Sequence, residues 1–447
     1  MGYSSEVRLR IWAALLGCLS LAGCGRERPP DVLLVTLDTT RTDALGCYGG
    51  ALAHTPHLDA LARGGARFAQ AISPTPYTGP AHASLLTGLY PPRHGLRDFL
   101  HQSMDGGVPT LADLLRVRGY RTGAFLSSYV LDRRFGLARG FEVYSCDFWR
   151  RHADGAAPRI VLGTPEFERR GAATVDEALA WLDRTGKDER PIFAWVHLYD
   201  PHLPYAPEPP FAPPQDAADP LTAARARYYG EVSYADAQVG RLLAWLRDTG
   251  REDRTIVVVT ADHGELLGEH GRTLGTHSTH LVEATVHVPL IVRAPGLPAR
   301  VVPEQVRLVD VFPTVLDLLR VAVPEGLDGR SLAPLLRGEA LASTPAYSET
   351  LYERFPEVAP AGAELVSLRE GAFKLLRSPV RRELYDLDTD PDELSDVGAA
   401  HPDLVAGLER ALRRVRELPQ APDAPLALEG EERERHLERL RSLGYAR

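Results

Sequence analysis

The chain has 447 residues, of which 44% are hydrophobic and 25% are charged, a composition typical of globular proteins. By length alone, the chain would allow about three domains. Its formal net charge is −9, so it lacks the basic excess with which proteins bind phosphate backbones. We therefore expect no nucleic acid as a binding partner.

The N-terminus has the pattern of an export signal. Two arginines precede the short apolar run Ile11 to Leu21, which predicts a secretory signal rather than a membrane span. The sequence L-A-G-C at 21–24 resembles the bacterial lipobox, which implies cleavage before Cys24 and lipidation of its thiol. The alternative is an ordinary signal peptide with an incidental cysteine. We expect a signal peptide at 1–23, a tether at 24–30 and an exported bacterial lipoprotein, membrane-anchored in the periplasm or on the cell surface.

Two further cysteines, Cys47 and Cys146, remain in the mature chain. An exported compartment permits a disulfide between them, but two buried thiols fit the sequence equally well.

Three apolar runs predict buried parallel strands, because they are continuous rather than alternating. Each run is followed by aspartate or histidine, at the sheet edge where open α/β folds bind their ligands. Asp38 follows the run Val32 to Leu37. His197, Asp200 and His202 follow the run Ile192 to Val196. Asp262 and His263 follow the run Ile256 to Thr260. Strand and helix signals alternate elsewhere, so we expect an α/β fold with a mostly parallel sheet sandwiched by helices.

Between the first two runs, residues 71–95 read AISPTPYTGPAHASLLTGLYPPRHG. Pro80 suits the first turn of a short helix, Gly79 to Leu86, and Gly88 suits its C-terminal cap. Thr78 then lies at the helix N-terminus, where free N–H groups favour an anion. A threonine hydroxyl becomes a nucleophile only when a base or a metal activates it. The alternative is that Thr78 is simply the N-cap of the helix.

Three blocks carry a resemblance to the sulfatase family of the alkaline phosphatase superfamily. They are D-T-T-R-T-D-A-L-G-C-Y-G at 38–49, T-G-P-A-H-A-S-L-L-T-G at 78–88 and T-A-D-H-G-E-L-L-G-E-H-G at 260–271. The resemblance implies an alkaline phosphatase/sulfatase-like catalytic domain at 31–340. It also implies a smaller α+β subdomain with a docking helix at 341–447.

By this resemblance, Asp38, Thr78, Asp262 and His263 form one metal site. Three oxygen ligands and one imidazole suit zinc, while calcium or manganese is possible. Thr39 stands where sulfatases usually carry a second aspartate, which argues against their calcium site.

A second metal is left open, with Asp200, His202, His277 and His280 as its candidate ligands. His202 and His277 fall where sulfatases place groups that contact the substrate, so both are candidate catalytic residues. His82 replaces an arginine of the family motif. It would orient Thr78 or the transferred group, or else it is a satisfied polar residue in the helix wall.

The nucleophile position decides the expected reaction. Sulfatases convert a Cys or Ser to formylglycine, and threonine cannot give that aldehyde. The T-x-P-x-H frame is instead similar to nucleotide pyrophosphatases, so we expect a metal-dependent hydrolase that cleaves phosphate mono- or diesters with Thr78. Its substrate would be a small-molecule, glycan or lipid ester. The alternatives are a sulfatase that works with unmodified threonine, a phosphotransferase, and an inactive binding protein that kept the fold.

Overall fold

The structure is a computed structural model that describes residues 28–98, 102–146, 168–213, 219–271, 274–351, 364–422, 424–426 and 428–442. The predicted signal peptide, Cys24 and part of the predicted tether lie outside these ranges. None of the helices within them is both long and apolar enough to cross a membrane.

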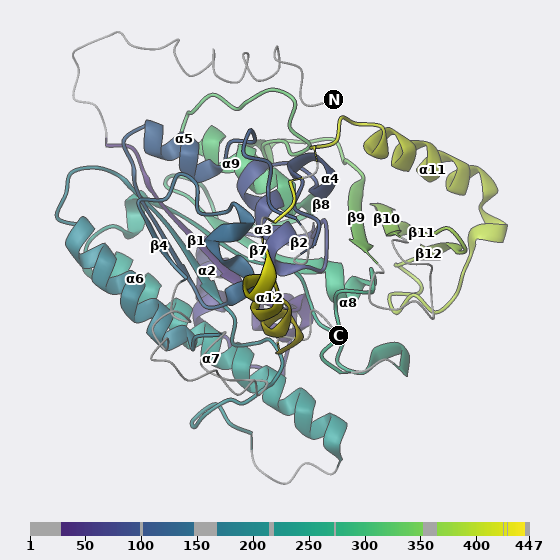
Figure 1. Cartoon of the computed structure of the whole chain (residues 1–447), viewed down its shortest axis with the longest axis horizontal. Coiled ribbons are helices and arrows are strands. Elements are labelled where there is room, and N and C mark those ends of the chain that lie inside the picture. The colour runs from purple at the N-terminus through teal and green to yellow at the C-terminus, as the bar shows by residue number, and fades with distance from the viewer. Residues whose placement is uncertain are drawn as a thin grey trace.

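An eight-stranded sheet forms the centre of the molecule (Figure 1), with the strand order β4-β3-β5-β1-β6-β7-β2-β8. The three predicted strands are confirmed as β1 (Asp31–Leu37), β5 (Ile192–Leu198) and β6 (Thr255–Ala261). They are parallel neighbours, and Leu37 of β1 is level with Leu198 and Ala261. The residues that follow these strands therefore come out of the sheet side by side.

The outer strands complete a mostly parallel sheet, as expected. They are β2 (Ala66–Ile72), β3 (Arg121–Leu126), β4 (Val143–Ser145), β7 (His287–Arg293) and β8 (Arg300–Arg307). β7 runs antiparallel to both β6 and β2, whereas the other pairs within this sheet are parallel.

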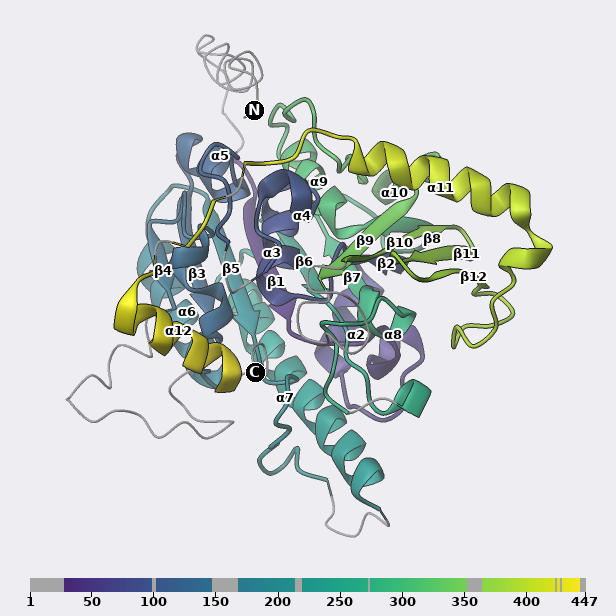
Figure 2. The same ribbon diagram turned by 45° about the vertical axis from the view of Figure 1, so that its right-hand side comes forward.

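Helices cover both faces of this sheet (Figure 2). Alternate residues of β1 point to opposite faces, and both sets are apolar, so each face must be covered from solvent. Val32 and Leu34 belong to the core beneath α3 (Thr78–Thr87), α5 (Leu111–Val117) and α9 (Val311–Leu318). Leu33 and Val35 belong to the core beneath α2 (Pro56–Gly64), α6 (Gly171–Thr185) and α7 (Pro220–Asp248). The short helices α4 (Pro91–His94), α8 (Glu283–Val286) and α10 (Ala333–Arg337) lie in the connections.

The expected C-terminal α+β subdomain is also present. Its antiparallel sheet has the order β12-β11-β10-β9 and is covered by α11 (Pro402–Arg416) (Figure 2). The strands are β9 (Ala346–Leu351), β10 (Glu364–Glu370), β11 (Phe373–Arg377) and β12 (Arg382–Asp386). The last helix, α12 (Gly430–Ser442), contacts the large domain, where His436 Nδ1 lies 3.0 Å from the hydroxyl of Tyr129.

A buried ionic cluster joins the subdomain to α8. Lys374 of β11 is 1% exposed, and its Nζ lies 3.1 Å from Glu283 Oε1 and 2.8 Å from Glu393 Oε1. Arg369 also pairs with Glu283. Burial alone would raise the pKa of Glu283, but Lys374 and then Arg369 lower it to about 2. The carboxylate is thus held in its charged form by the subdomain.

We expect Glu283→Gln to lower the free energy of unfolding by about 3 kcal/mol at pH 7, because it leaves two buried cations short of a partner. The native pKa is lower than that of an unfolded glutamate, about 4.3. The deficit should therefore be constant above that value and vanish as the pH falls toward 2. Denaturant unfolding of both proteins from pH 7 to 2 measures it. Glu339→Gln, from an exposed pair with Arg337, is the matched control and should change little. A deficit unchanged down to pH 2 would contradict the assignment.

Candidate active site

Four side chains predicted from separate parts of the sequence meet at the carboxyl edge of the central strands. Asp38 follows β1, Asp262 and His263 follow β6, and Thr78 opens α3. All four are buried. Ligand atoms of Asp38, Asp262 and His263 lie within 4.8 Å of one another. The Thr78 hydroxyl lies 3.3 Å from Asp38 Oδ2 and 3.3 Å from His263 Nε2.

Thr78 is not the N-cap of its helix. Tyr77 holds that position, and Thr78 is the first helical residue of α3. Gly88 closes the helix with a φ of 71°, as predicted from the sequence. The alternative that Thr78 serves only as a cap is therefore wrong. Its hydroxyl is directed at the carboxylate and the imidazole described above, with the helix N-terminus behind it.

The site carries an excess of buried negative charge. Burial raises the pKa of Asp38 well above its ordinary value, and the nearby carboxylate of Asp262 raises it further. Asp38 Oδ1 and Asp262 Oδ2 are buried without a hydrogen-bond partner in the described part of the chain. Two carboxylates so arranged need a positive charge between them. The donor set of two aspartates, a histidine and a hydroxyl fits a divalent cation.

His82 lies in the wall of the helix. Its Nδ1 donates to the Thr78 carbonyl at 2.6 Å, one turn back, and its Nε2 lies 2.9 Å from Thr36 Oγ1. The imidazole is fully buried, and burial, followed by the proximity of His197, lowers its pKa to about 3. His82 thus touches the backbone of Thr78, while its two ring nitrogens are both engaged.

The hydroxyl of Thr36 fixes the proton positions of this cluster. Trp195 Nε1 donates a hydrogen bond to Thr36 Oγ1 at 3.1 Å. The Thr36 hydroxyl donates its own proton to His82 Nε2, because His82 Nδ1 already donates to the Thr78 carbonyl. His197 Nδ1, 3.0 Å away, must then donate to the same oxygen. The Nε2 lone pair of neutral His197 consequently faces Asp38 Oδ2 at 3.3 Å. Two acceptor atoms that face each other repel, so this contact also favours a cation at the site.

A second polar group lies on the other side of His263. The ring of His277 stacks on His263 with centroids 4.5 Å apart and meets His202 edge-on at 5.3 Å. Glu265 Oε1 lies 2.9 Å from His277 Nδ1, and Glu265 Oε2 accepts from the Tyr205 hydroxyl at 3.3 Å. Burial raises the pKa of Glu265 to about 7. His202 Nδ1 donates to the Leu203 carbonyl at 2.6 Å.

Of the four candidate ligands for a second metal, His202 and His277 contact each other, but Asp200 and His280 are engaged elsewhere. Asp200 accepts two hydrogen bonds from the Gly171 N–H, 3.0 Å each, and pairs with Arg170, so it holds the start of α6. His280 Nδ1 lies 2.9 Å from Thr279 Oγ1. Within the described ranges, the set of Asp38, Asp262 and His263 is the one group of three or more such side chains.

The sequence pattern placed His197 at the sheet edge without a role, and it did not assign Thr36 or Glu265 to the site. A signal for Thr36 existed, because it is level with His197 in the neighbouring strand and is the polar residue of an otherwise apolar run. The two cysteines do not form a disulfide: Cys47 is half-buried and Cys146 is buried.

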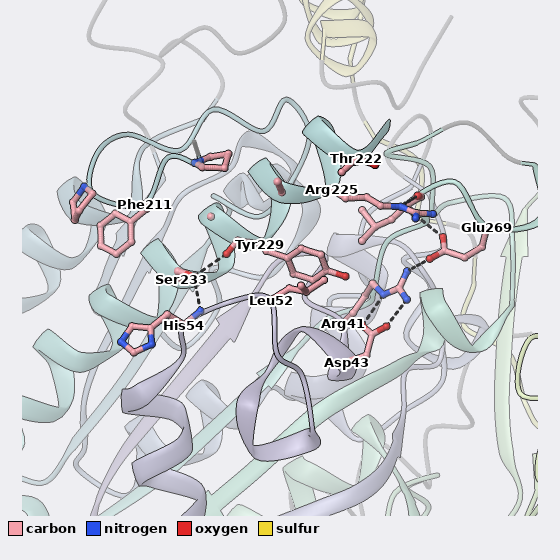
Figure 3. Close-up of a pocket in the computed structure, with 15 residues that line it drawn as sticks. Arg41, Asp43, Leu52, His54, Phe211, Thr222, Arg225, Tyr229, Ser233 and Glu269 are labelled. Atoms are coloured by element: carbon pink, nitrogen blue, oxygen red, sulfur yellow. Dashed lines mark hydrogen bonds and ion pairs between the residues drawn. The ribbon is translucent and has the colours of Figure 1, made fainter. Parts of the chain in front are cut away.

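A pocket of about 870 Å³ lies between α7 and the segments around Leu52 and Phe211 (Figure 3). Arg41, Tyr229 and Glu269 are among the residues that line it. The guanidinium of Arg41 pairs with Asp43 at 2.5 Å and with Glu269 at 2.6 Å, so its charge is already balanced.

Comparison with known proteins identifies the family. The family model described as Sulfatase matches residues 30–321, which include all four central side chains. This chain belongs to the sulfatase family. A second family model, described as the C-terminal part of N-sulphoglucosamine sulphohydrolase, matches residues 268–417.

Individual relatives of known name also belong to the sulfatases. The ulvan-active sulfatase of Formosa agariphila is 29% identical, over 69% of this chain and 65% of its own length. Arylsulfatase K of Mus musculus is 25% identical, over 88% of this chain and 80% of its own length. Among solved structures, the phosphonate monoester hydrolase of Agrobacterium radiobacter superposes with a TM-score of 0.73 at 27% identity. That match covers 87% of this chain and 95% of the hydrolase.

These relatives correct the expected reaction. The threonine at position 78 pointed to phosphate-type mono- or diesters, but the curated relatives are named as sulfatases. The prediction of a phosphate ester hydrolase is therefore wrong. Its physical weakness is that sulfate and phosphate esters are both tetrahedral oxyanions, so a hydroxyl nucleophile does not distinguish the atom that it attacks. The prediction of a metal-dependent ester hydrolase is confirmed at the level of the family.

Proposed function

We propose that this protein hydrolyses sulfate esters of small molecules or glycans and that Thr78 is its nucleophile. The observation that carries the proposal is the Thr78 hydroxyl, which stands at a helix N-terminus between Asp38 and His263. Relatives named as sulfatases, one of them active on ulvan, support the choice of ester. Retention at a membrane through Cys24 stays a prediction.

The reaction has two steps. Thr78 Oγ1 attacks sulfur, the bond from sulfur to the ester oxygen breaks, and the proton of the hydroxyl ends on the departing alcohol. Water then attacks the sulfur of the threonyl-sulfate, which restores the hydroxyl and releases sulfate and a proton. Attack at sulfur is required in the second step, because a threonyl ester lacks the hemiacetal by which formylglycine enzymes expel sulfate.

Asp38, Thr78, Asp262 and His263 would hold a metal ion, for which zinc suits the mixture of oxygen and nitrogen ligands. When bound, the ion would make the Thr78 hydroxyl more acidic and offset the charge of the sulfate group. The residues themselves orient the hydroxyl: Asp38 Oδ2 accepts its hydrogen bond, and His82 fixes the backbone carbonyl of Thr78.

His277, which stacks on His263 and is held by Glu265, would contact the sulfate group. Because His277 Nδ1–H donates to Glu265, the ring presents its Nε2 edge away from that carboxylate. His202 packs against the same ring and is held by the Leu203 carbonyl. The positions of the two histidine rings are therefore fixed.

We expect Glu265→Leu to lower kcat/KM by about 10- to 100-fold, the equivalent of one hydrogen bond to a charged group. Glu265→Gln keeps an acceptor oxygen for His277 Nδ1–H and should retain most of the activity. Steady-state kinetics of the two variants test this difference. Equal losses in both would show that the carboxylate does not act through His277.

The proposed function is tested with purified protein and two kinds of substrate, 4-nitrophenyl sulfate and sulfated oligosaccharides. Released sulfate is measured by ion chromatography, with and without treatment by a chelator. The Thr78→Ala protein, purified in the same way, corrects for contaminating sulfatases. Sulfate release that depends on Thr78 supports the proposal. Release no greater than that of Thr78→Ala on every ester would overturn it.

A further inference from the structure

A strained residue follows the first candidate metal ligand. Thr39 has a φ of 48°, in the left-handed region, and lies directly after Asp38. Threonine is β-branched, and such residues adopt this region only at a cost in free energy, which the surroundings must offset. Of the three non-glycine residues with positive φ in the described ranges, Thr39 is the β-branched one. Its hydroxyl is buried and makes no hydrogen bond to any described residue, so the side chain does not explain the conformation.

The hydroxyl of Tyr228, on α7, closes this turn. It donates to the Thr39 carbonyl at 2.9 Å and accepts from the Arg41 N–H at 3.0 Å. One side chain thus joins two backbone groups that do not reach each other directly. The Tyr228 ring is fully buried and meets Tyr205 edge-on at 5.4 Å and Tyr229 at 5.3 Å, so its hydroxyl has a fixed position.

The position of Asp38 depends on this turn. Before it, the backbone is fixed to the sheet, because the Asp38 N–H donates to the Leu198 carbonyl at 2.9 Å. After it, the chain leaves the sheet through Thr39. A relaxed Thr39 would turn the peptide plane that joins it to Asp38, and the backbone of Asp38 would have to adjust, which would displace its side chain. The repulsion between the buried carboxylates of Asp38 and Asp262 would favour such a movement.

We propose that Tyr228 is a positioning residue that holds Asp38 in the candidate metal centre by clamping the strained turn at Thr39. The inference rests on the proposed function only for the presence of a metal centre, since Tyr228 touches neither the substrate nor Thr78. The proposal gives α7, a helix on the outer layer of the fold, a role in metal binding, because the Tyr228 hydroxyl reaches the turn between Asp38 and Arg41.

The test measures Zn²⁺ binding by isothermal titration calorimetry on chelator-treated protein, without any substrate. Tyr228→Phe removes only the hydroxyl and should weaken Zn²⁺ binding about tenfold, the equivalent of one net hydrogen bond. Adding Thr39→Gly should restore most of the affinity, because glycine adopts positive φ without strain. Thr39→Gly alone should bind nearly as the parent does. Tyr229→Phe, on the same helix and facing the pocket of Figure 3, is the matched control.

Three results would overturn the clamp: no Zn²⁺ binding by the parent protein, parent-like binding by Tyr228→Phe, or a double variant as weak as Tyr228→Phe. A merely structural role of the tyrosine would lower the melting temperature but would not be rescued at Thr39. Folding of each variant is checked by circular dichroism, and binding is measured on the monodisperse fraction. If the clamp is found but no sulfate ester is cleaved, the proposed function fails while this inference stands.

Discussion

Replacing Thr78 with alanine is expected to reduce ester hydrolysis by about 10⁴-fold or more, as the loss of a nucleophile does in other hydrolases. The fold should persist. The change removes one buried hydroxyl and its hydrogen bond to Asp38, which is worth about 1 kcal/mol. The variant should therefore lose almost all of its activity but little of its stability. Steady-state rates measure the activity, and denaturant unfolding measures the stability.

The same helix supplies the control for this prediction. Thr87 is also buried in α3, and its hydroxyl donates to the Ala83 carbonyl one turn back, far from the ligands. Thr87→Ala should lose a similar amount of stability and keep its activity. Thr78→Ser retains a hydroxyl and should remain measurably active. Mass spectrometry of the peptide containing Thr78, after rapid quenching with a slow sulfate ester, should show an added sulfuryl group. Near-normal activity of Thr78→Ala would instead make water the nucleophile.

The fold followed from short-range patterns. Continuous apolar runs predicted the three central strands, and the aspartates after them marked the edge at which they end. Pro80 and Gly88 predicted α3 within a residue or two of its bounds. These features depend on hydrophobic periodicity and on backbone conformation, which the local sequence determines.

The surroundings of the site could not be predicted in this way. Glu265 reaches His277 across twelve residues, and Tyr228 reaches Thr39 from a helix far along the chain. Asp200 lies one residue further beyond its strand than Asp38 and Asp262 lie beyond theirs, and its carboxylate holds the first turn of α6. A pattern of residues after strands identifies which side chains reach the edge. It does not identify which of them turn toward one another.

The choice between sulfate and phosphate esters failed for a different reason. The nucleophile limits how an ester is attacked, whereas the groups around the transferred oxyanion select sulfur or phosphorus. Among the groups proposed to lie near it in this chain is His202, whose pKa is lowered to about 3 by burial and then by the proximity of His277. A neutral imidazole adds no positive charge, which agrees with the single negative charge of a sulfate monoester.

Replacing Asp38 with asparagine should abolish metal binding and activity and yet stabilise the metal-free protein, by about 1–2 kcal/mol. The carboxylate of Asp38 is buried near that of Asp262, and one of its oxygens has no partner among the described residues. An asparagine amide removes the repulsion between the two carboxylates. Its N–H₂ group can also donate to the Nε2 lone pair of His197, which faces the same position at 3.3 Å.

Denaturant unfolding of chelator-treated proteins at pH 7, followed by titration with Zn²⁺, measures both effects. The parent should gain stability as the metal concentration exceeds its dissociation constant, whereas Asp38→Asn should not respond, so the order of stability reverses. Asp310→Asn is the matched control, because this buried aspartate pairs with Arg307 at 2.6 Å and its loss should destabilise with or without metal. If metal-free Asp38→Asn were less stable than the metal-free parent, the carboxylate of Asp38 would be satisfied by the protein alone. The inference of a cation between Asp38 and Asp262 would then lose its physical basis.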